Sequence, residues 1–410
     1  MYQRNIAGSL LEALQDSPAV FLHGARQTGK TTLVRALAGQ EHPARYLTLD
    51  DAAVLAAAGR DPQGFVAGLK GPAILDEVQR VPEMFLAIKG AVDRDRQPGR
   101  FLLTGSANVL LLPHLSGTLV GRAEILPLWP LSQGEIEGVQ ESFVDRVFSD
   151  SRLDWRPKRI SKSDLVARIV QGGFPEAVTR TSPSRRGRWF ESYVTTLLQR
   201  DVRDLSNING LTGIPRLLSL LAARAGSLLN YSEISRTAGI PQTTLKRYLS
   251  LLHASFLIQP LPAFSANLGK RLVKSPKIFL TDSGLLSHVQ GLSSERLSGE
   301  PHLLGPVLEN FVAMELRKQI SWSKRRPAMY HFRSQSGEEV DVVLEDSRGR
   351  VVGIEVKATE SVRTDDFKGL RVLASSLGER FQRGLLIHTG QDVIPFQADI
   401  QAVPVGCLWE

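Results

Sequence analysis

An eight-residue stretch near the N-terminus has the residue types and spacing of a phosphate-binding loop. Residues 24–31 read Gly-Ala-Arg-Gln-Thr-Gly-Lys-Thr, which matches the pattern G-x-x-x-x-G-K-S/T without departure. The glycines let the backbone curl so that successive N–H groups point inward at a polyphosphate. The ammonium of Lys30 can then reach the β- and γ-phosphate oxygens, and the hydroxyl of Thr31 is placed for Mg²⁺. The stretch therefore predicts a site for a triphosphate and its magnesium ion.

The flanking segments supply the context that such a loop requires. Residues 19–22 form an apolar run typical of a buried strand, and residues 31–38 have a helical pattern. The amino end of that helix would turn its partial positive charge towards the same phosphates. The alternative is a glycine turn that carries a surface lysine, and it does not need this order of strand, loop and helix.

Two adjacent carboxylates end a later apolar run and could complete the chemistry. Residues 73–77 read Ala-Ile-Leu-Asp-Glu. Asp76 would hold the magnesium shell, usually through water, and Glu77 would orient and deprotonate the attacking water. Because Asp76 ends a buried run, an unpaired charge at that position would be costly. The alternative for Glu77 is to start the next helix.

Further polar residues lie next to neighbouring predicted strands. One buried strand finishes in Thr104 and Ser106, and ligands collect at the carboxyl ends of strands in a parallel sheet. We therefore expect Thr104 or Ser106 to sense the γ-phosphate, while capping of a helix at residues 108–112 is the alternative. Arg122, before a fifth strand at residues 123–126, is a candidate arginine finger or sensor. A surface arginine explains it equally well.

Length and composition limit the class of protein. A chain of 410 residues is too long for one core and suggests roughly two to four domains. Its single cysteine, Cys407, excludes an internal disulfide framework and a cysteine metal cluster, which fits a reducing compartment. No segment approaches the ~20 apolar residues of a membrane span, so we expect a cytoplasmic protein without a membrane partner. The net charge of +8 favours a polyanionic partner only modestly, because a generally basic protein explains it equally well.

The motifs of the first third together resemble a known family. The chain is similar to the predicted AAA-type ATPases of bacteria and archaea that carry a C-terminal domain of formerly unknown function, through residues 24–31, 32–33, 74–79, 103–107, 121–122, 127–128 and 130–132. The resemblance implies a five-stranded parallel core, ATP with Mg²⁺, and hydrolysis rather than binding alone. The residues implied to bind ATP are Gly24, Ala25, Arg26, Gln27, Thr28, Gly29, Lys30, Thr31 and Thr32. AAA-type ATPases often assemble into rings, so the resemblance leaves a homo-oligomer open, but no residue of the sequence settles the oligomeric state.

The middle of the chain predicts a helical lid followed by a winged helix. Residues 230–252 contain two helical patterns broken at Gly239, which is helix-turn-helix spacing. Residues 256–258 and 277–280 read as the two strands of a wing. The residues suited to a DNA groove or its phosphates are Gln242, Thr244, Lys246, Arg247, Lys270, Arg271, Lys274 and Lys277. We therefore expect DNA as a partner, although winged helices also serve purely as protein contacts.

The last third brings acidic residues and a lysine onto predicted neighbouring elements. Glu309 lies on a predicted helix, Asp341 lies on a strand, and the next strand ends in Glu355 and Lys357 on one face. This order resembles the PD-(D/E)xK nuclease core of restriction enzymes and Holliday-junction resolvases. The resemblance implies that Asp341 and Glu355 bind Mg²⁺ with help from Glu309, and that Lys357 steadies the attacking water or the developing charge. Members of that superfamily can also keep the fold without cleaving DNA.

The sequence as a whole predicts an α/β protein built from four parts. These are a P-loop AAA-type ATPase core at residues 1–130, a helical lid at 131–225, a winged helix at 226–290 and a restriction-endonuclease-like domain at 291–410. The predicted function is Mg²⁺-dependent ATP hydrolysis on or with DNA, including branched DNA, by a DNA-binding or DNA-cleaving protein. One alternative is a regulatory switch ATPase whose C-terminal half recognises a protein. Another is an ATP-binding antitoxin or defence component.

Overall fold

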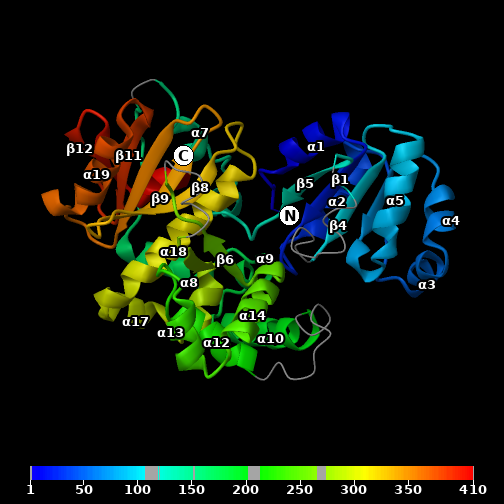
Figure 1. Ribbon diagram of the computed structural model, residues 1–410, viewed down its shortest axis with the longest axis horizontal. Helices are drawn as coiled ribbons and strands as arrows, with labels where there is room; N and C mark the ends of the chain where they lie inside the picture. Colours follow the sequence, from blue (N-terminus) through cyan, green and yellow to red (C-terminus); the bar gives the residue numbers. More distant parts are fainter. Residues whose placement is uncertain are drawn as a thin grey trace. The chain divides into compact units, whose positions relative to one another are not determined.

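The computed structural model describes residues 2–106, 119, 121–150, 153–201, 213–265 and 274–409. These residues fall into two compact units, which are drawn in the colours of the sequence in Figure 1. One unit comprises residues 3–130 with 250–257, and the other comprises residues 1–2, 131–249 and 258–410. The helix predicted at residues 108–112 and the predicted DNA contacts Lys270 and Arg271 lie outside the described residues.

The first unit is built on a parallel sheet. Its strands are β1 (Ala19–His23), β2 (Arg45–Thr48), β3 (Ala73–Asp76), β4 (Phe101–Gly105) and β5 (Ala123–Pro127). They pair in the order β2-β3-β4-β1-β5, and each pairing is parallel. The predicted five-stranded parallel core is therefore confirmed.

Both faces of this sheet are covered by helices, which explains why its strands read as continuous apolar runs. In β1, Ala19 and Phe21 pack on one face, while Val20 and Leu22 pack on the other. The helices of the first unit are α1 (Ala7–Asp16), α2 (Lys30–Gln40), α3 (Ala52–Arg60), α4 (Pro62–Ala67) and α5 (Glu83–Arg94). Helices α1 and α2 contribute to the core on the side of Val20, and α3, α4 and α5 contribute to the core on the side of Phe21.

The second unit begins with a helical region. Its helices are α6 (Gln133–Glu137), α7 (Phe143–Arg146), α8 (Lys162–Gln171), α9 (Pro175–Val178), α10 (Pro183–Thr196), α12 (Ile214–Ala222), α13 (Tyr231–Ala238), α14 (Gln242–Ala254), α16 (Ser283–Val289) and α17 (Ser294–Gly299). Residues 250–254 at the end of α14 belong to the first unit. Helix α10 passes into the π-helical turn η3 (Leu197–Asp201). The pair α13 and α14 is separated at Gly239, whose φ of +69° ends α13 in a left-handed C-cap.

A two-stranded antiparallel hairpin lies between α14 and α16 in the chain and is formed by β6 (Ile258–Leu261) and β7 (Lys277–Leu280). The strand predicted at residues 277–280 is confirmed, but the strand predicted at residues 256–258 begins later than the sequence indicated. Phe256 has a φ of +58°, and the backbone N–H of Leu257 donates to the carbonyl of Leu252. Residues 256–257 therefore turn at the end of α14 and are not extended.

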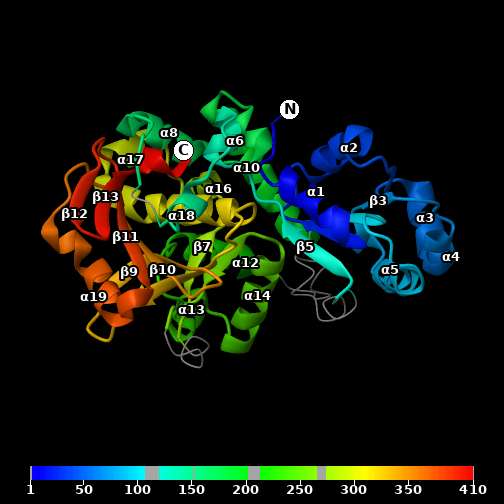
Figure 2. The ribbon, with the colours of Figure 1, turned by 90° about the horizontal axis from the view of Figure 1, so that it is seen from above.

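The last part of the chain forms a mixed sheet of six strands in the order β12-β13-β11-β10-β9-β8. The strands are β8 (Ala328–Arg333), β9 (Glu339–Glu345), β10 (Val351–Lys357), β11 (Phe381–His388), β12 (Ile394–Gln397) and β13 (Ile400–Pro404). Helices α18 (Pro301–Ile320) and α19 (Lys368–Leu377) pack against this sheet (Figure 2). The short helix η7 (Val405–Trp409) closes the described chain. The three strands predicted between residues 328 and 357 are confirmed.

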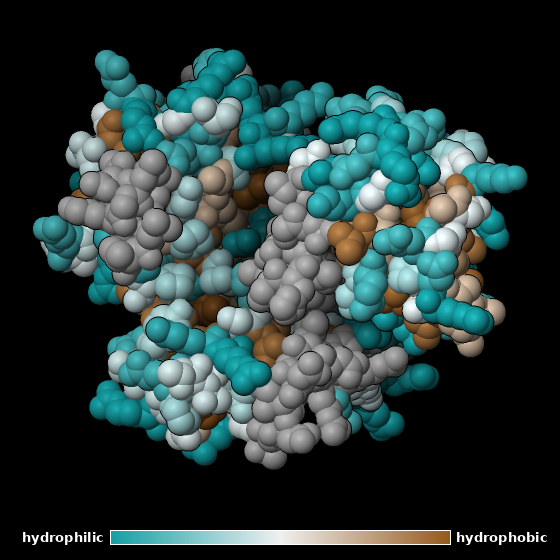
Figure 3. Space-filling view, turned by 45° about the vertical axis from the view of Figure 1, so that its right-hand side comes forward, coloured by the Kyte–Doolittle hydropathy of each residue, from teal (hydrophilic) through white to brown (hydrophobic). Residues whose placement is uncertain are grey.

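The surface of the described residues is mainly polar. Figure 3 shows hydrophilic residues over most of the visible face, with small scattered hydrophobic patches. Among the described residues, the large hydrophobic side chains that are exposed are Leu86, Val139 and Ile394. In the same part of the chain, each helix is too short or too polar to cross a membrane.

Candidate functional site

The loop at residues 24–31 joins the carboxyl end of β1 to the first turn of α2. Its sharp curl depends on two glycines. Gly29 has a φ of +94°, and a Cβ on Gly24 would lie 2.1 Å from the carbonyl oxygen of Leu128. A side chain at Gly24 would therefore collide with the backbone, and one at Gly29 would be strained. Gln27 also has a positive φ, +61°, which adds to the curl.

The side chain of Lys30 lies inside this loop. It is 4% exposed, and its Nζ donates to the carbonyls of Gly24 (3.0 Å) and Ala25 (2.9 Å). Arg4 holds the loop from another segment, because its guanidinium donates to the carbonyls of Thr28 and Trp129, both at 2.7 Å. No motif near the N-terminus indicated this role for Arg4.

Three hydroxyl groups converge on the carboxylate of Asp76 at the end of β3. Thr31 and Tyr46 donate to its Oδ2 at 2.9 and 2.6 Å, and the hydroxyl of Thr104 contacts its Oδ1. Thr31 belongs to α2 and Thr104 to β4, so the parallel sheet brings both to one edge. The sequence did not predict Tyr46 at this site. Tyr46 lies on β2 two residues before Thr48, so the two side chains are on the same face of the strand.

Glu77 is fixed by its backbone and by its neighbours. Its φ of +59° is left-handed, and its N–H donates to the hydroxyl of Thr104 at 3.1 Å. The amide of Gln79 contacts the carboxylate of Glu77 and donates to the hydroxyl of Ser106 at 2.9 Å. Thr104, Glu77, Gln79 and Ser106 therefore form one line of polar groups at the carboxyl edge of the sheet.

Two titratable side chains beside the loop are held neutral. Burial, with a smaller contribution from the charge of Lys30, lowers the pKa of His23 to about 3. Burial and the hydrogen bond to the Asp76 carboxylate raise the pKa of Tyr46. At neutral pH, His23 and Tyr46 therefore add no charge to this site.

The structure does not bring Arg122 to this edge. Arg122 precedes the first residue of β5, and Ala123 is in register with Ala19 at the amino end of β1. The loop at 24–31 follows the opposite end of β1. The guanidinium of Arg122 pairs instead with the carboxylate of Asp93 on α5, with an NH2–Oδ2 distance of 3.1 Å. The other residues predicted to contact ATP lie on the loop and on α2. Among them, Gln27 and Thr32 are exposed and Arg26 is half-buried.

The second unit does bring its predicted acidic residues together. We define the acid cluster as Glu309 on α18, Asp341 on β9 and Glu355 on β10, all of them mostly buried. Lys357 donates to Oε1 of Glu355 at 2.7 Å, as expected for alternate residues on one face of a strand. The backbone N–H of Val356 donates to Oδ2 of Asp341 at 3.0 Å.

A polar pocket of about 480 Å³ opens beside the acid cluster. Asp341, Glu355 and Lys357 line it, together with Lys368 at the start of α19 and with Asp365 and Asp366 in the turn just before that helix. Oε2 of Glu355 is buried and has no hydrogen-bond partner. Burial and the charge of Asp341 raise the pKa of Glu355 to about 8 and that of Glu309 well above its usual range.

Lys277 is the residue whose position differs most from the prediction. The sequence suggested that it contacts DNA phosphates from the wing, but its side chain is only 3% exposed. Its Nζ lies 2.7 Å from Oε1 of Glu309 and 2.8 Å from Oδ1 of Asp341. Across the described ranges, no group of three or more His, Cys, Asp or Glu side chains is spaced to hold a metal ion. In this arrangement the ammonium group of Lys277 joins Glu309 to Asp341.

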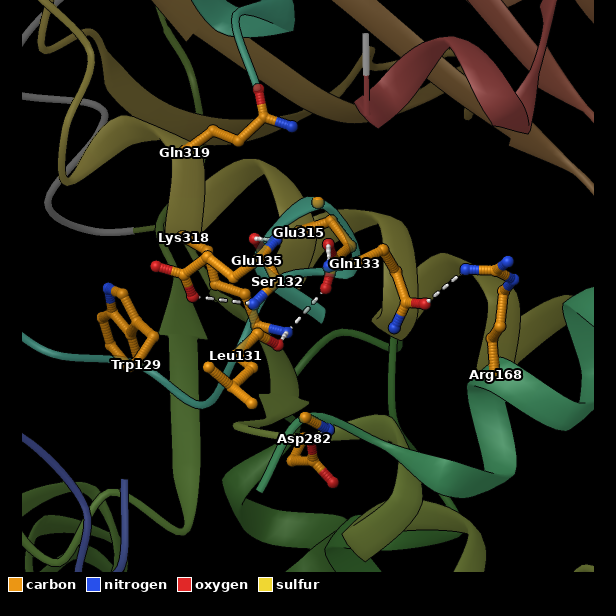
Figure 4. A network of polar contacts seen from close by, with 12 residues as sticks. Trp129, Leu131, Ser132, Gln133, Glu135, Arg168, Asp282, Glu315, Lys318 and Gln319 are labelled. Carbon is orange, nitrogen blue, oxygen red and sulfur yellow. Dashed lines mark hydrogen bonds and ion pairs between the residues drawn. The ribbon is translucent and has the colours of Figure 1, made fainter. Parts of the chain in front are cut away.

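A second buried polar network lies around the residues that follow β5 (Figure 4). Glu315 on α18 accepts from the N–H of Gln133 at 2.9 Å, and Lys318 donates to Glu315 at 2.6 Å and to the carbonyl of Leu131 at 2.9 Å. Glu141 accepts from the N–H of Gly134 at 2.8 Å. The network anchors the start of α6 to the C-terminal part of α18, the helix that also carries Glu309.

The protonation of Glu141 should make the stability of the second unit depend on pH. Burial, and then the negative charge of Glu315, raises the pKa of Glu141 to about 8. The folded chain therefore keeps a proton that the unfolded chain loses near its ordinary pKa of about 4.5. The free energy of unfolding should fall by up to about 1.4 kcal/mol per pH unit as the pH rises through this window.

Chemical denaturation between pH 5 and pH 9 measures this dependence. The Glu141→Gln variant should show a shallower fall, and Glu379→Gln, which changes an exposed acid, should behave as the wild type does. An equally steep fall in Glu141→Gln would show that Glu141 is not the source.

The curled loop, the acid pair after β3 and the parallel sheet define the class of the first unit as a P-loop ATPase of the AAA type. The family described as "AAA domain" matches residues 16–137. Two families described as domains of unknown function, DUF8612 and DUF4143, match residues 162–296 and 304–408. The chain belongs to the same family as the uncharacterized proteins Rv2008c of Mycobacterium tuberculosis and Mb2031c of Mycobacterium bovis. It is 31% identical to each over 406 residues, which is 98% of this chain and 83% of each relative.

Among solved structures, the Walker-type ATPase PABY2304 of Pyrococcus abyssi is similar with a TM-score of 0.44. It is 18% identical, and the match covers 71% of this chain and 96% of that chain.

Proposed function

We propose that this chain is a Mg²⁺-dependent ATPase that acts on or with DNA. The observation that carries the ATPase assignment is the line of contacts from Thr31 through Asp76 and Thr104 to Glu77, beside a curled loop that contains Lys30. These groups come from separate strands and helices, and such convergence at the carboxyl edge of a parallel sheet is typical of a ligand site.

The residues of this edge fit Mg²⁺, because the hydroxyl of Thr31 and the carboxylate of Asp76 are hard oxygen ligands within 2.9 Å of each other. When bound, the ion would neutralise charge on the transferred phosphoryl group. The ammonium of Lys30 would bind the phosphates in place of the loop carbonyls. Glu77 would accept the proton of the attacking water, and Thr104 would hold the backbone of Glu77 in position.

The part of the proposal that concerns DNA rests on α13, α14 and the hairpin of β6 and β7, which we interpret as a winged helix. Gln242, Lys246 and Arg247 lie on the exposed side of α14, and Lys274 is exposed just before β7. These side chains could contact phosphates or a groove. Lys277 is buried against Glu309 and Asp341, so it does not belong to this surface.

The acid cluster supports a second candidate function, a PD-(D/E)xK-type domain that binds or cleaves DNA with a divalent metal. The specific observation is that Glu355 has a buried oxygen without a hydrogen-bond partner next to Lys357 and Asp341. The rival is a regulatory switch ATPase whose C-terminal half binds a protein. The salt bridge from Lys277 favours that rival, because it pairs two of the acidic residues, Glu309 and Asp341, without a metal.

ATP turnover compared with no DNA, single-stranded DNA, duplex DNA and a four-way junction separates these functions. We expect at least one DNA to accelerate phosphate release, and we expect Arg247→Glu to lose that acceleration because it reverses a charge on the proposed surface. Gels run on the same samples report any Mg²⁺-dependent nicking, which Asp341→Ala should abolish. A rate of ATP turnover that none of these DNAs changes would favour the regulatory switch. Nicking that persists in Asp341→Ala would indicate a contaminating nuclease.

A further inference from the structure

Lys277 brings a positive charge to the acid cluster from a different part of the fold, in addition to that of Lys357 on β10. Glu309, Asp341 and Glu355 lie on α18, β9 and β10, whereas Lys277 is the first residue of β7 in the separate two-stranded hairpin. A third carboxylate, that of Glu339, lies 3.8 Å from the same ammonium. Lys277 therefore has two close carboxylate partners and one more distant partner.

Hydrogen bonds from neighbouring elements hold β7, the strand that carries Lys277, so the position of the backbone fixes where the ammonium lies. The N–H and carbonyl of Leu280, at the other end of β7, both bond the side-chain amide of Asn310, at 2.8 and 3.0 Å. The N–H of Gly226 donates to the carbonyl of Ile278 at 2.8 Å, and a Cβ on Gly226 would lie 2.8 Å from the Glu309 carboxylate. The hairpin and α18 thus fix Lys277 against Glu309.

The ammonium of Lys277 bonds carboxylate oxygens that a divalent metal would need as ligands. Oδ1 of Asp341 bonds Lys277, and Oδ2 accepts from Val356 N–H. Oε1 of Glu355 bonds Lys357, so Oε2 is the oxygen of Asp341 and Glu355 for which the structure gives no hydrogen bond. A Mg²⁺ or Mn²⁺ ion needs an approximately octahedral shell of oxygens, and a neighbouring ammonium repels it.

We propose that Lys277 is a built-in cation that closes the acid cluster, and that the cluster binds a divalent metal only when this ammonium is withdrawn or removed. The inference rests on the proposed metal-binding character of Asp341 and Glu355, and it is independent of ATP hydrolysis. Withdrawal would require movement of the hairpin, so the position of the proposed wing would decide whether the C-terminal site can take up metal. Lys277 is therefore a positioning residue, because it does not bind the metal but its ammonium controls whether a metal can bind the acid cluster.

The test measures Mn²⁺ binding to the nucleotide-free, full-length protein by the electron paramagnetic resonance signal of free Mn²⁺. We expect Lys277→Met to gain one Mn²⁺ site per chain, with an affinity at least tenfold higher than any such site in the wild type. Adding Asp341→Asn should remove the gained site. Lys324→Met deletes an exposed positive charge beyond the end of α18 and should bind Mn²⁺ as the wild type does.

A second variant covers the case in which Lys277→Met does not fold, because it leaves Glu309 and Asp341 unpaired. Lys277→Met combined with Glu309→Gln removes one charge of each sign and should gain the same Asp341-dependent site. Two results would overturn the inference. One is an equally tight Asp341-dependent site in the wild type, which would leave the proposed metal site intact. The other is the absence of a gained site in both variants.

Discussion

The Glu77→Gln variant is expected to bind ATP and hydrolyse it at least about 100-fold more slowly than the wild type. A positioned general base typically contributes a factor of about 10² to 10⁴ to the rate. The amide of glutamine has nearly the same shape as the carboxylate but cannot accept the proton of the attacking water. The measurements are steady-state phosphate release and, in parallel, the Kd for ATP.

Glu83→Gln is the matched control for this prediction. It makes the same chemical change at an exposed acid in the first turn of α5 and should leave the turnover number unchanged. If Glu77→Gln hydrolysed ATP at the wild-type rate, Glu77 would not be the base, and its contacts with Gln79 would then have a structural purpose only.

The Lys318→Met variant should destabilise the second unit by about 3–5 kcal/mol, because breaking a buried ion pair leaves an uncompensated charge. Lys318 and Glu315 are 5% and 1% exposed and lie 2.6 Å apart. The carbonyl of Leu131 would also lose its contact with the ammonium. Thermal unfolding should show a midpoint lowered by on the order of 10 °C.

Two further variants test whether the broken ion pair causes the loss of stability in Lys318→Met. Lys324→Met removes an exposed lysine beyond the end of α18 and should change the midpoint little. Glu315→Gln combined with Lys318→Met removes both charges and should recover most of the lost stability. A midpoint for Lys318→Met equal to that of the wild type would mean that the buried pair does not anchor α6 to α18.

Much of the nucleotide site was predictable because it is encoded locally. The loop at 24–31 carries its own glycines and lysine, and Asp76 and Glu77 end a strand whose apolar pattern is continuous. The parallel order of the sheet then places Thr104 next to Asp76 without further information. Arg4 and Tyr46 were missed because their partners, the carbonyl of Thr28 and the carboxylate of Asp76, lie 24 and 30 residues further along the chain, and no local pattern records such contacts.

In the second unit, too, contacts between residues that are far apart in the sequence could not be predicted. The period-two pattern and the resemblance to PD-(D/E)xK proteins predicted that Asp341, Glu355 and Lys357 share one region. They could not predict Lys277, because a lysine at the start of a short strand has the same local pattern whether it faces solvent or a buried acid. Its burial depends on Glu309 and Asp341, which lie 32 and 64 residues further along the chain.

Phosphate release from ATP by the purified full-length protein, compared with Lys30→Ala in the presence of Mg²⁺ or of a chelator, tests the central claim most directly. The account predicts Mg²⁺-dependent release by the wild type and a loss of at least about 100-fold in Lys30→Ala, as expected when a group that stabilises the transition-state charge is removed. Equal release by the two proteins, or release that persists without Mg²⁺, would contradict the assignment of this loop as the site of ATP hydrolysis.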